Sequence, residues 1–505
     1  MGDAAGSTRG SGVPRWVGAV VPVVGVALGA LPLILMGSMA GRGAFDQLNY
    51  HEPMIRRFAE AWPSVDLSNY LSATTPLYHL LLAGLAVLQP GPASEASDTL
   101  LRLAGLVFAM LAVGGLGWWV SARAGAISGA LCGLALGSGL YFFASAAWLL
   151  PDDAGWAGVL LVLALCLRPR LGVAGLFVAG LAVLLLVLVR QSHVWTAAIV
   201  WTAAWLSALD WDEGETTEPW EDIVPLLARV PRSLGRVGVG VVATVPAFAA
   251  VAWFHHHWGG FVPPVYHSYM QGANPAVVSL IGLQLAIIGG AFAGFWLPSL
   301  VAAWHEASGA RQAALTGAFA CAALVGLAIA LGPETTWNKD EGRWSGYWNL
   351  TQKLPDVLGR TNLGFVVACP VGCVALLGLL RGADRRTRWV VLGALVSAAA
   401  ALTINQNAWQ RYQEPLLVIL LSLLAASCAG WRPAGGTIER VARVVGPGLL
   451  VLMYVGITAS SLSSAEPAVL LDRHPRVEEP LRDLWPPSWQ DEPPASWSGA
   501  GSQPE

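Results

Sequence analysis

The sequence predicts an all-α protein that crosses a membrane many times. Of its 505 residues, 55% are hydrophobic and only 12% are charged, whereas ordinary globular chains carry about 25% charged residues. The chain holds 57 Gly, 32 Pro and 24 Trp, residue types that are common in membrane helices and at membrane interfaces. The net charge of −3 excludes a broad basic face for nucleic acid, because neutralising phosphates needs clustered Lys and Arg. We therefore expect a polytopic membrane protein whose surroundings include membrane lipids and no nucleic acid.

A spanning helix needs about 20 largely apolar residues, and windows of that length predict about thirteen transmembrane helices. The predicted segments are 16–38, 98–120, 126–148, 154–168, 172–189, 193–208, 237–254, 276–303, 312–332, 362–380, 389–404, 413–430 and 444–462. The first has an apolar run longer than the roughly 7–15 residues of a cleavable signal peptide, so it is expected to be a helix of the protein. Residues 1–15 then form a cytoplasmic N-terminus and residues 16–462 a membrane domain. The tail 463–505, rich in Pro, Trp and acids, is expected to be disordered.

The arginines predict the orientation of these segments. With a cytoplasmic N-terminus, the cytoplasmic loops hold most of the arginines, including the cluster Arg381, Arg385, Arg386 and Arg388, as the positive-inside rule requires. The polar stretches expected outside are 39–97, 149–153, 190–192, 255–275, 333–361 and 405–412. The cytoplasmic loop 209–236 is expected to be solvated, with a surface helix. In a bacterium this describes a multi-pass protein of the plasma (inner) membrane.

The first outer loop, 39–97, reads as secondary structure rather than as a linker. Residues 46–61 place apolar side chains among charges with helical spacing. The apolar run 77–88 has about 12 residues and is too short to span a bilayer, so it should be re-entrant or lie along the interface. We expect interfacial helices in this loop and, together with the late outer loop 333–361, a cap over a cleft.

Acidic residues at the outer end of the bundle are the first candidates for chemistry, because ionisable groups are costly in a membrane. Asp46 lies shortly after the first predicted span. It is either a helix N-cap or a general base that takes a proton from an attacking hydroxyl. Asp152 and Asp153 follow Pro151 in a short outer turn. One of the pair could cap the next helix while the other faces a site.

Outer cations are the second set of candidates, because they can hold a phosphate. Arg190 interrupts an apolar stretch and Arg411 lies in the loop 405–412, while Lys339 and Arg343 lie in 333–361. The guanidinium fork suits phosphate oxygens, although snorkelling to the headgroup region also explains an arginine at the end of a helix.

A metal site is not indicated, and no cofactor is predicted with certainty. The run His255-His256-His257 cannot direct three consecutive side chains at one ion on a regular helix, and no acid adjoins it. Cys369 and Cys373 are four residues apart, but no further ligands accompany them, so packing is the favoured interpretation. A divalent metal stays an open alternative.

The order of short motifs resembles the C-type membrane glycosyltransferases, and distantly the dolichyl-phosphate-glucose α-1,2-glucosyltransferase family among them. In that family an acidic pair follows the first span, and His-x-Pro and Ile-Thr-Thr with Gly-Leu-Tyr come next. Here Asp46, His51-Glu52-Pro53 and Thr74-Thr75-Pro76-Leu77-Tyr78 occur in that order. The family's Thr-Asp turn is similar to Pro151-Asp152-Asp153, and its Arg-Gln-Thr-Asn before a Trp to Arg190-Gln191-Ser192-His193-Val194-Trp195.

Two more motifs continue the resemblance, and two positions depart from it. The family's Gly-Gly loop is similar to Trp258-Gly259-Gly260, and its late Arg-His-Tyr to Arg411-Tyr412. Gln47 stands where the family has its second acid, and Val262-Pro263-Pro264 replaces its Gly-Asp-Lys. These departures concern the sugar donor and the acceptor more than the class of reaction.

The resemblance implies inverting transfer of a sugar from a polyprenyl-phosphate-linked donor to a hydroxyl acceptor on a glycolipid, glycan or protein, at the extracytoplasmic face. Asp46 would be the base, with Asp152 or Asp153 positioning the acceptor or polarising the surroundings of Asp46. The implied donor and phosphate ligands are Arg190, Gln191, His193, Arg411 and Tyr412. The implied acceptor or supporting residues are His51, Thr75, Tyr78, Lys339 and Arg343.

Two alternatives stay open. A transporter or lipid flippase would want ionisable residues near the middle of the membrane and repeated halves, and the predicted segments offer few such charges. An O-antigen ligase or polymerase type of enzyme also uses an outer loop, but it takes a diphosphate-linked glycan.

Overall fold

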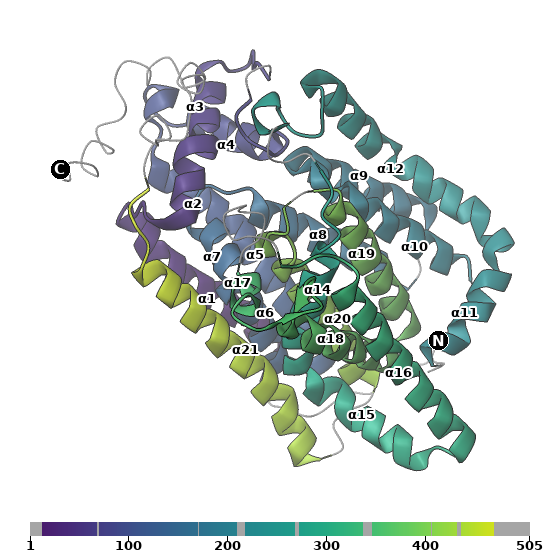
Figure 1. The fold of residues 1–505 in the computed structure, drawn as a ribbon. Coiled ribbons are helices and arrows are strands. Elements are labelled where there is room, and N and C mark those ends of the chain that lie inside the picture. The colour runs from purple at the N-terminus through teal and green to yellow at the C-terminus, as the bar shows by residue number, and fades with distance from the viewer. Residues whose placement is uncertain are drawn as a thin grey trace.

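The computed structural model describes residues 13–67, 70–169, 171–209, 218–267, 272–336, 346–405, 407–431 and 436–468. Nearly all of the regular structure in these ranges is helical (Figure 1). The exception is a hairpin of two strands, β1 (Asp356–Val357) and β2 (Thr361–Asn362), which pair antiparallel. The all-α prediction is therefore confirmed for the part of the chain that the structure describes.

Each of the thirteen predicted segments is a helix or a bent pair of helices. The elements are α1 (Arg15–Leu35), α5 (Asp98–Ala124), α6 (Ala126–Ser138) with α7 (Leu140–Ala147), α8 (Asp152–Cys166), α9 (Val173–Val189), α10 (Ala197–Ser207), α12 (Val230–Trp258), α14 (Val277–Ala291) with α15 (Ala293–Glu306), α16 (Gly309–Leu331), α18 (Leu363–Gly382), α19 (Arg385–Thr403), α20 (Glu414–Trp431) and α21 (Thr437–Ser463). By length and hydropathy, seven of the described helices can cross a membrane, or nine if each bent pair is one span. The remaining four segments, α8, α9, α10 and α19, do not meet that criterion, so the structure supports seven to nine spans.

Two predicted spans are bent rather than straight. The axes of α6 and α7 meet at 74° and those of α14 and α15 at 79°. The first break lies at Gly139, whose backbone is extended (φ −59°, ψ 133°). A Cβ at this position would come within 2.6 Å of a Glu414 oxygen, so the Glu414 side chain would have to shift if another residue replaced Gly139.

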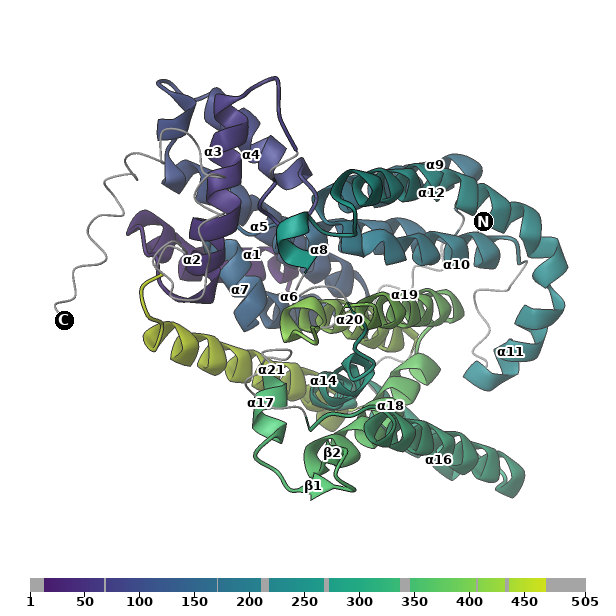
Figure 2. The ribbon, with the colours of Figure 1, turned by 45° about the horizontal axis from the view of Figure 1, so that its top comes forward.

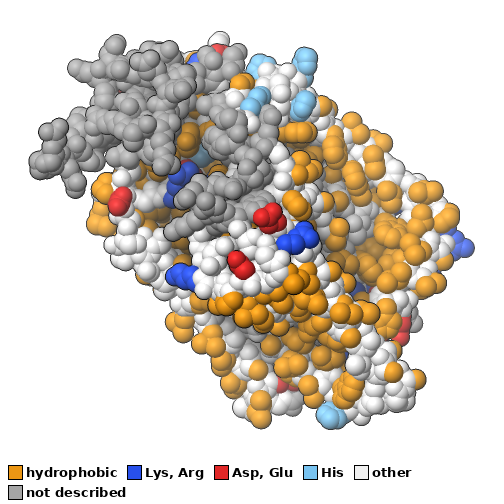
Figure 3. Space-filling view, viewed as in Figure 1, with side chains coloured by type: hydrophobic (Ala, Val, Ile, Leu, Met, Phe, Trp, Pro, Cys, Tyr) orange, Lys and Arg blue, Asp and Glu red, His pale blue; other side chains and the backbone are white. Residues whose placement is uncertain are grey.

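The helical body exposes large apolar side chains, as expected for contact with lipid. Leu28 in α1 is 69% exposed and Leu324 in α16 is 64% exposed. Hydrophobic side chains cover much of the face in Figure 3, with few charges among them. By contrast, 94% of the most apolar window of the candidate span Gln410–Gly430, which contains most of α20, is buried. Helix α20 contacts α5, α18 and α19 and forms the centre of the bundle.

The first outer loop holds the helices that its sequence predicts. Helix α2 (Gly41–Asp46), the π-helical turn η1 (Gln47–His51) and α3 (Glu52–Glu60) follow one another, and α4 (Leu77–Val87) corresponds to the short apolar run. A 3-10 turn, η2 (Ala93–Glu95), precedes α5. Met54, Phe58 and Leu82 form an apolar core between these helices. In Figures 1 and 2, α3 and α4 lie together at one end of the bundle, away from α11.

The remaining loops contain short helical elements. They are η3 (Gln191–Thr196), α11 (Pro219–Ala228), η4 (Pro264–Tyr266), α17 (Tyr347–Thr351) and η6 (Gln410–Tyr412). Lys339, Arg343 and most of the tail 463–505 lie outside the described residues, so the predictions about them remain predictions.

The loop 209–236, which the sequence predicts to be cytoplasmic, differs from its predicted solvated state. Helix α11 is present, but Asp222 and Glu218 are buried, 1% and 6% exposed. Asp222 pairs with Arg388 and Arg385 at 2.9 and 2.8 Å, and Glu218 pairs with Arg381 at 2.8 Å. The acids therefore bind α11 to α18 and α19, which hydropathy along one segment could not reveal.

Candidate active site

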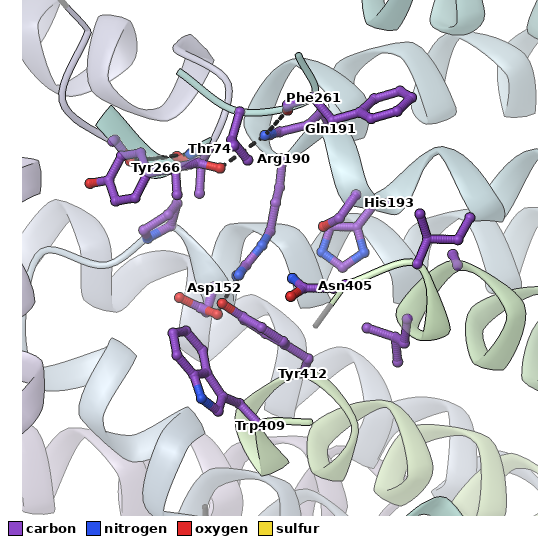
Figure 4. A pocket seen from close by; sticks show the side chains of 18 of the residues that line it. Thr74, Asp152, Arg190, Gln191, His193, Phe261, Tyr266, Asn405, Trp409 and Tyr412 are labelled. Atoms are coloured by element: carbon purple, nitrogen blue, oxygen red, sulfur yellow. Dashed lines mark hydrogen bonds and ion pairs between the residues drawn. The ribbon is translucent and has the colours of Figure 1, made fainter. Parts of the chain in front are cut away.

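A cavity of about 720 Å³ opens where the first outer loop meets the ends of α8, α12 and α20 (Figure 4). Its wall combines α2 and η1, residues 72–74, the start of α8, η3, the end of α12 with residues 259–262, and residues 401–412. These segments are separated by up to several hundred positions in the chain. The predicted residues that line the cavity are Asp46, His51, Asp152, Arg190, Gln191, His193, Arg411 and Tyr412.

Asp46 and Arg411 form an ion pair in this cavity. Arg411 Nη1 lies 2.8 Å from Asp46 Oδ2, and Arg42 Nε lies 3.4 Å from Asp46 Oδ1. The carboxylate makes no hydrogen bond that caps a helix, and the helical run begins earlier, at Gly41. The N-cap interpretation of Asp46 is therefore wrong, since its oxygens face cationic side chains instead of backbone amides.

Asp152 and Arg190 form a second ion pair. Arg190 Nη1 donates to Asp152 Oδ1, and both side chains are more than nine-tenths buried. Asp152 lies in the first turn of α8, where the helix dipole favours a negative charge. Neither Asp152 nor Asp153 caps α8, because its N-cap is Pro151, so the capping interpretation of this pair is also wrong.

Tyr412 lies close to both arginines. The Arg190 guanidinium carbon is 4.6 Å from the centre of the Tyr412 ring, and that of Arg411 is 5.1 Å from it. Cations over the face of an aromatic ring are attracted by its quadrupole. The ring therefore helps to hold the two guanidinium groups near each other, as Figure 4 shows for Arg190 and Tyr412.

The short helix η6 that carries Arg411 is fixed by its neighbour Gln410. The Gln410 side chain accepts a hydrogen bond from the backbone N–H of Tyr347 at 2.7 Å and donates to Glu414 in α20. Because α20 is the most buried of the candidate spans, Arg411 and Tyr412 project from a rigid base.

Gln191 connects two walls of the cavity. Its side-chain amide donates to Ala73 O and to Phe261 O, both at 2.9 Å, so the loop before α4 and the loop after α12 meet at η3 (Figure 4). The second loop begins at Gly259, whose φ of 68° ends α12 in the left-handed conformation that favours glycine.

His193 lines the cavity with both ring nitrogens buried and without a hydrogen-bond partner among the described residues. Its ring packs edge-on against Trp156, with centroids 5.2 Å apart. A Cβ at position 155 would come within 2.9 Å of His193 Nε2, so Gly155 makes room for the imidazole. A buried polar group is normally paired, and an unpaired imidazole on a cavity wall is suited to bind a ligand.

Gln47, at the position of the family's second acid, lies outside the cavity wall. Its amide nitrogen donates to Glu52 and Asp98 at 2.9 Å each, and its oxygen accepts from the Leu149 backbone N–H at 3.1 Å. It therefore ties η1 to α5 and to the turn before α8, and in this way supports the position of Asp46.

Three of the predicted site residues do not line the cavity. Asp153 is 1% exposed, and its carboxyl oxygens have no partner among the described residues. Thr75 donates from Oγ1 to Val187 O at 2.5 Å, and Tyr78 is buried against His79 and Phe108. These side chains point into the protein, so any contribution they make is to support.

Sequence reasoning missed several side chains of the cavity. Tyr50, Trp156, Tyr266, Asn405 and Trp409 all line it. The polar pair Asn405 and Asn407, close before Arg411 and after an apolar helix, is a signal that could have pointed to Asn405. The aromatic residues carried no such signal, because the sequence contains 24 Trp and most are accounted for by packing or an interfacial belt.

Among the described residues, no group of three or more His, Cys, Asp or Glu side chains is arranged to hold a metal ion. Arginine guanidinium groups are the main positive charges of this cavity.

No family model and no curated protein matches this sequence. Two solved structures are similar, both of ArnT from Cupriavidus metallidurans. The crystal structure bound to undecaprenyl phosphate is 19% identical, with 87% of this chain and 79% of that chain covered and a TM-score of 0.31. The apo crystal structure is 18% identical, with 89% and 80% covered and a TM-score of 0.29. At these scores the similarity does not decide what this chain does.

Proposed function

We propose that this protein is a membrane glycosyltransferase that takes a sugar from a polyprenyl-phosphate-linked donor and transfers it, with inversion, to a hydroxyl acceptor. The proposal rests on the presence of two ion pairs, Asp46 with Arg411 and Asp152 with Arg190, in one cavity. The site thus holds a candidate base and two phosphate ligands side by side.

Arg190 and Arg411 would bind the phosphate of the donor. Arginine binds phosphate through paired N–H groups, and both guanidinium groups lie near the Tyr412 ring. A phosphate between them would compete with the two carboxylates for the same N–H groups. Binding of the donor would therefore draw Arg411 away from Asp46 and leave a carboxylate oxygen free to accept a proton.

In the transfer step, the acceptor hydroxyl oxygen forms a bond to the anomeric carbon of the sugar, and the bond from that carbon to the phosphate oxygen breaks. The bonding electrons stay on the phosphate, and the hydroxyl proton passes to Asp46. The leaving phosphate already carries negative charge, so no general acid is needed, and Arg190 and Arg411 stabilise the additional charge.

The apolar side of the cavity suits the lipid part of such a donor. Val251 in α12, and Ala401, Leu402 and Ile404 at the end of α19, line the cavity, and Ile404 is 67% exposed. An isoprenoid chain could lie along this side while the phosphate reaches the arginines. The acceptor would approach from the first outer loop, where Tyr50 and Thr74 line the wall.

Incubation of the purified protein in nanodiscs with a panel of polyprenyl-phosphate sugars tests the proposal, with consumption of the donor as the readout. Asp46→Asn should lower the rate of transfer by about 10²–10⁴, the usual contribution of a catalytic base. Loss of the ion pair with Arg411 should also lower the melting temperature, so the rate is measured at a temperature where the variant is folded. Asp66→Asn is the matched control, because Asp66 is an acid of the same loop with a side chain that is 54% exposed.

Full activity of Asp46→Asn would exclude Asp46 as the base. If no donor of the panel is consumed and radiolabelled lipid instead moves across the bilayer of proteoliposomes, the flippase alternative replaces this proposal.

A further inference from the structure

A buried chain of three side chains runs from the cavity wall into the first outer loop. His51 Nδ1 lies 2.9 Å from His79 Nε2, and His79 Nδ1 lies 2.7 Å from the Tyr70 hydroxyl. His51, His79 and Tyr70 are 6%, 0% and 2% exposed. His51 lines the cavity, whereas His79 and Tyr70 lie behind it. The hydrogen bonds of this chain can run in one of two directions, either from Tyr70 toward His51 or from His51 toward Tyr70.

The contacts of Tyr70 decide between these arrangements. Its hydroxyl lies 2.7 Å from His79 Nδ1 and 3.3 Å from the backbone oxygen of Thr75, and the Ser72 and Thr74 hydroxyls also interact with it. The His79 contact is much the shorter and lies within the usual range of about 2.5–3.0 Å for a hydroxyl donor, so we assign the Tyr70 proton to it. A neutral imidazole that accepts at one nitrogen carries its proton on the other. His79 therefore donates from Nε2 to His51 Nδ1, and His51 carries its own proton on Nε2.

The Nε2 atom of His51 is available to the cavity. Among the described residues, the hydrogen bonds of His51 involve Nδ1, with His79 and, at 3.4 Å, Ser72. Burial lowers the pKa of His51 to about 4, opposed by the carboxylates of Asp46 and Asp152 and assisted by Arg411 and Arg190. The ring is thus neutral near pH 7, and it lies close enough to all four charged groups to be influenced by them.

We propose that Tyr70 and His79 are positioning residues that hold His51 as a neutral Nε2–H donor, and that this N–H binds the phosphate of the lipid donor beside Arg190 and Arg411. The phosphate part rests on the proposed function, and the tautomer part does not. A neutral donor adds a hydrogen bond without a third positive charge. It also has no free lone pair at Nε2, so it does not compete with Asp46 for the acceptor proton.

Nitrogen-15 NMR of the histidine-labelled full chain in nanodiscs tests the tautomer, with His51→Gln used to assign the signal. The expected result is a protonated Nε2 and an unprotonated Nδ1, unchanged from pH 7.5 to 5.5. A proton on Nδ1, or titration of His51 within that range, overturns the assignment. His305→Gln serves as the control, because removing a histidine at an exposed position should leave the His51 signal in place.

Two variants of similar size at position 79 test the effect on binding. In His79→Gln the amide can still donate to His51 Nδ1, whereas in His79→Glu the carboxylate accepts and moves the His51 proton to Nδ1. Binding of undecaprenyl phosphate without sugar should weaken about tenfold or more in His79→Glu and stay within about threefold of the parent in His79→Gln. If His79→Glu does not fold, Tyr70→Phe replaces it as the test variant. Tyr70→Phe removes only the hydroxyl and should shift the tautomer of His51.

The outcomes separate this inference from the proposed function. Equal affinity of the two position-79 variants, with opposite tautomers confirmed by NMR, overturns the role of His51 in phosphate binding. Equal loss in both variants indicates a structural role of His79 and also overturns it. If undecaprenyl phosphate binds as expected but no sugar donor is consumed, the proposed reaction fails while the inference stands.

Discussion

At the scale of single residues, the choice of arginine over lysine in the cavity is informative. The sequence contains only two lysines, Lys339 and Lys353, and both lie in the late outer loop. Arg190 combines an ion pair with Asp152 and a contact with the Tyr412 ring. A lysine could supply the charge, but not both the fork of N–H groups and the flat face that stacks on a ring.

Replacing either cavity arginine by lysine should therefore weaken donor binding although the charge is kept. For Arg190→Lys and Arg411→Lys we expect the KM for the lipid donor to rise about 10-fold or more, since a charged hydrogen bond contributes about 1.5–3 kcal/mol. Steady-state kinetics with a varied donor concentration measures this. Arg360→Lys is the control, because Arg360 is exposed and donates to Gly332 O. An unchanged KM in both cavity variants would argue against phosphate binding there.

The sequence could identify the individual charges, but not how they pair. Asp46, Asp152, Arg190 and Arg411 stand out because ionisable residues are scarce in an apolar chain. Asp46 and Arg411 are 365 positions apart, and no local pattern relates them. Asp152 and Asp153 could not be distinguished either, because adjacent positions on a helix differ by about 100° and only the packing of α8 decides which one faces the cavity.

At the scale of elements, α11 shows how a polar helix is held against an apolar bundle. Asp222 is 1% exposed and accepts from Arg388, Arg385 and the Trp389 indole. Removing one charge of a buried cluster leaves the others without compensation, at a cost of about 3–5 kcal/mol. The ion pairs of α11 should therefore matter for stability.

We expect Asp222→Asn to lower the thermal stability of the protein in detergent markedly, and Asp356→Asn, at an exposed position of the hairpin, to change it little. The comparison is made by thermal unfolding of the two variants and the parent. Adding Arg388→Met to Asp222→Leu should recover part of the loss, because an apolar pair can replace a buried ion pair. A melting temperature of Asp222→Asn equal to that of the parent would show that the cluster does not hold α11.

The helices themselves could largely be predicted, because the spacing of apolar residues and the hydropathy of a segment are local properties of the sequence. The breaks within them could not. The run Gly137-Ser138-Gly139 offered a signal for the bend between α6 and α7, since glycines weaken a helix. The Glu414 side chain, which closely approaches Gly139, comes from a helix almost 300 positions away. Gly289-Gly290 offered a comparable signal just before the bend between α14 and α15.

At the scale of the whole molecule, the charges divide between two ends of an apolar body. One end carries the cavity with its two ion pairs, and the other carries α11 and the arginines of α18 and α19. Several of those arginines bind within the protein: Arg386 donates to Cys166 O at 2.9 Å, and Arg388 pairs with Asp222. Part of the arginine bias, from which the sequence predicts the orientation, thus has a structural role.

The orientation can be tested directly, because the structure offers exposed positions at both ends. Ser64 lies after α3, and Ser308 lies between α15 and α16; both are exposed, and Figure 1 places α3 and the α15–α16 turn at opposite ends. In a Cys321→Ala background, which removes the exposed native thiol, Ser64→Cys should react with an impermeant maleimide on intact cells. Ser308→Cys should react only after lysis.

The reverse pattern would place the cavity on the cytoplasmic side. The arginines of the cavity would then face the compartment that contains nucleotide sugars, and the donor would have to be sought there. Equal labelling of both positions on intact cells would mean that the cells leak, which a cytoplasmic marker protein detects. Labelling of Ser64→Cys alone requires that the lipid donor present its sugar outside, so that the acceptor hydroxyl must also be reached from that face.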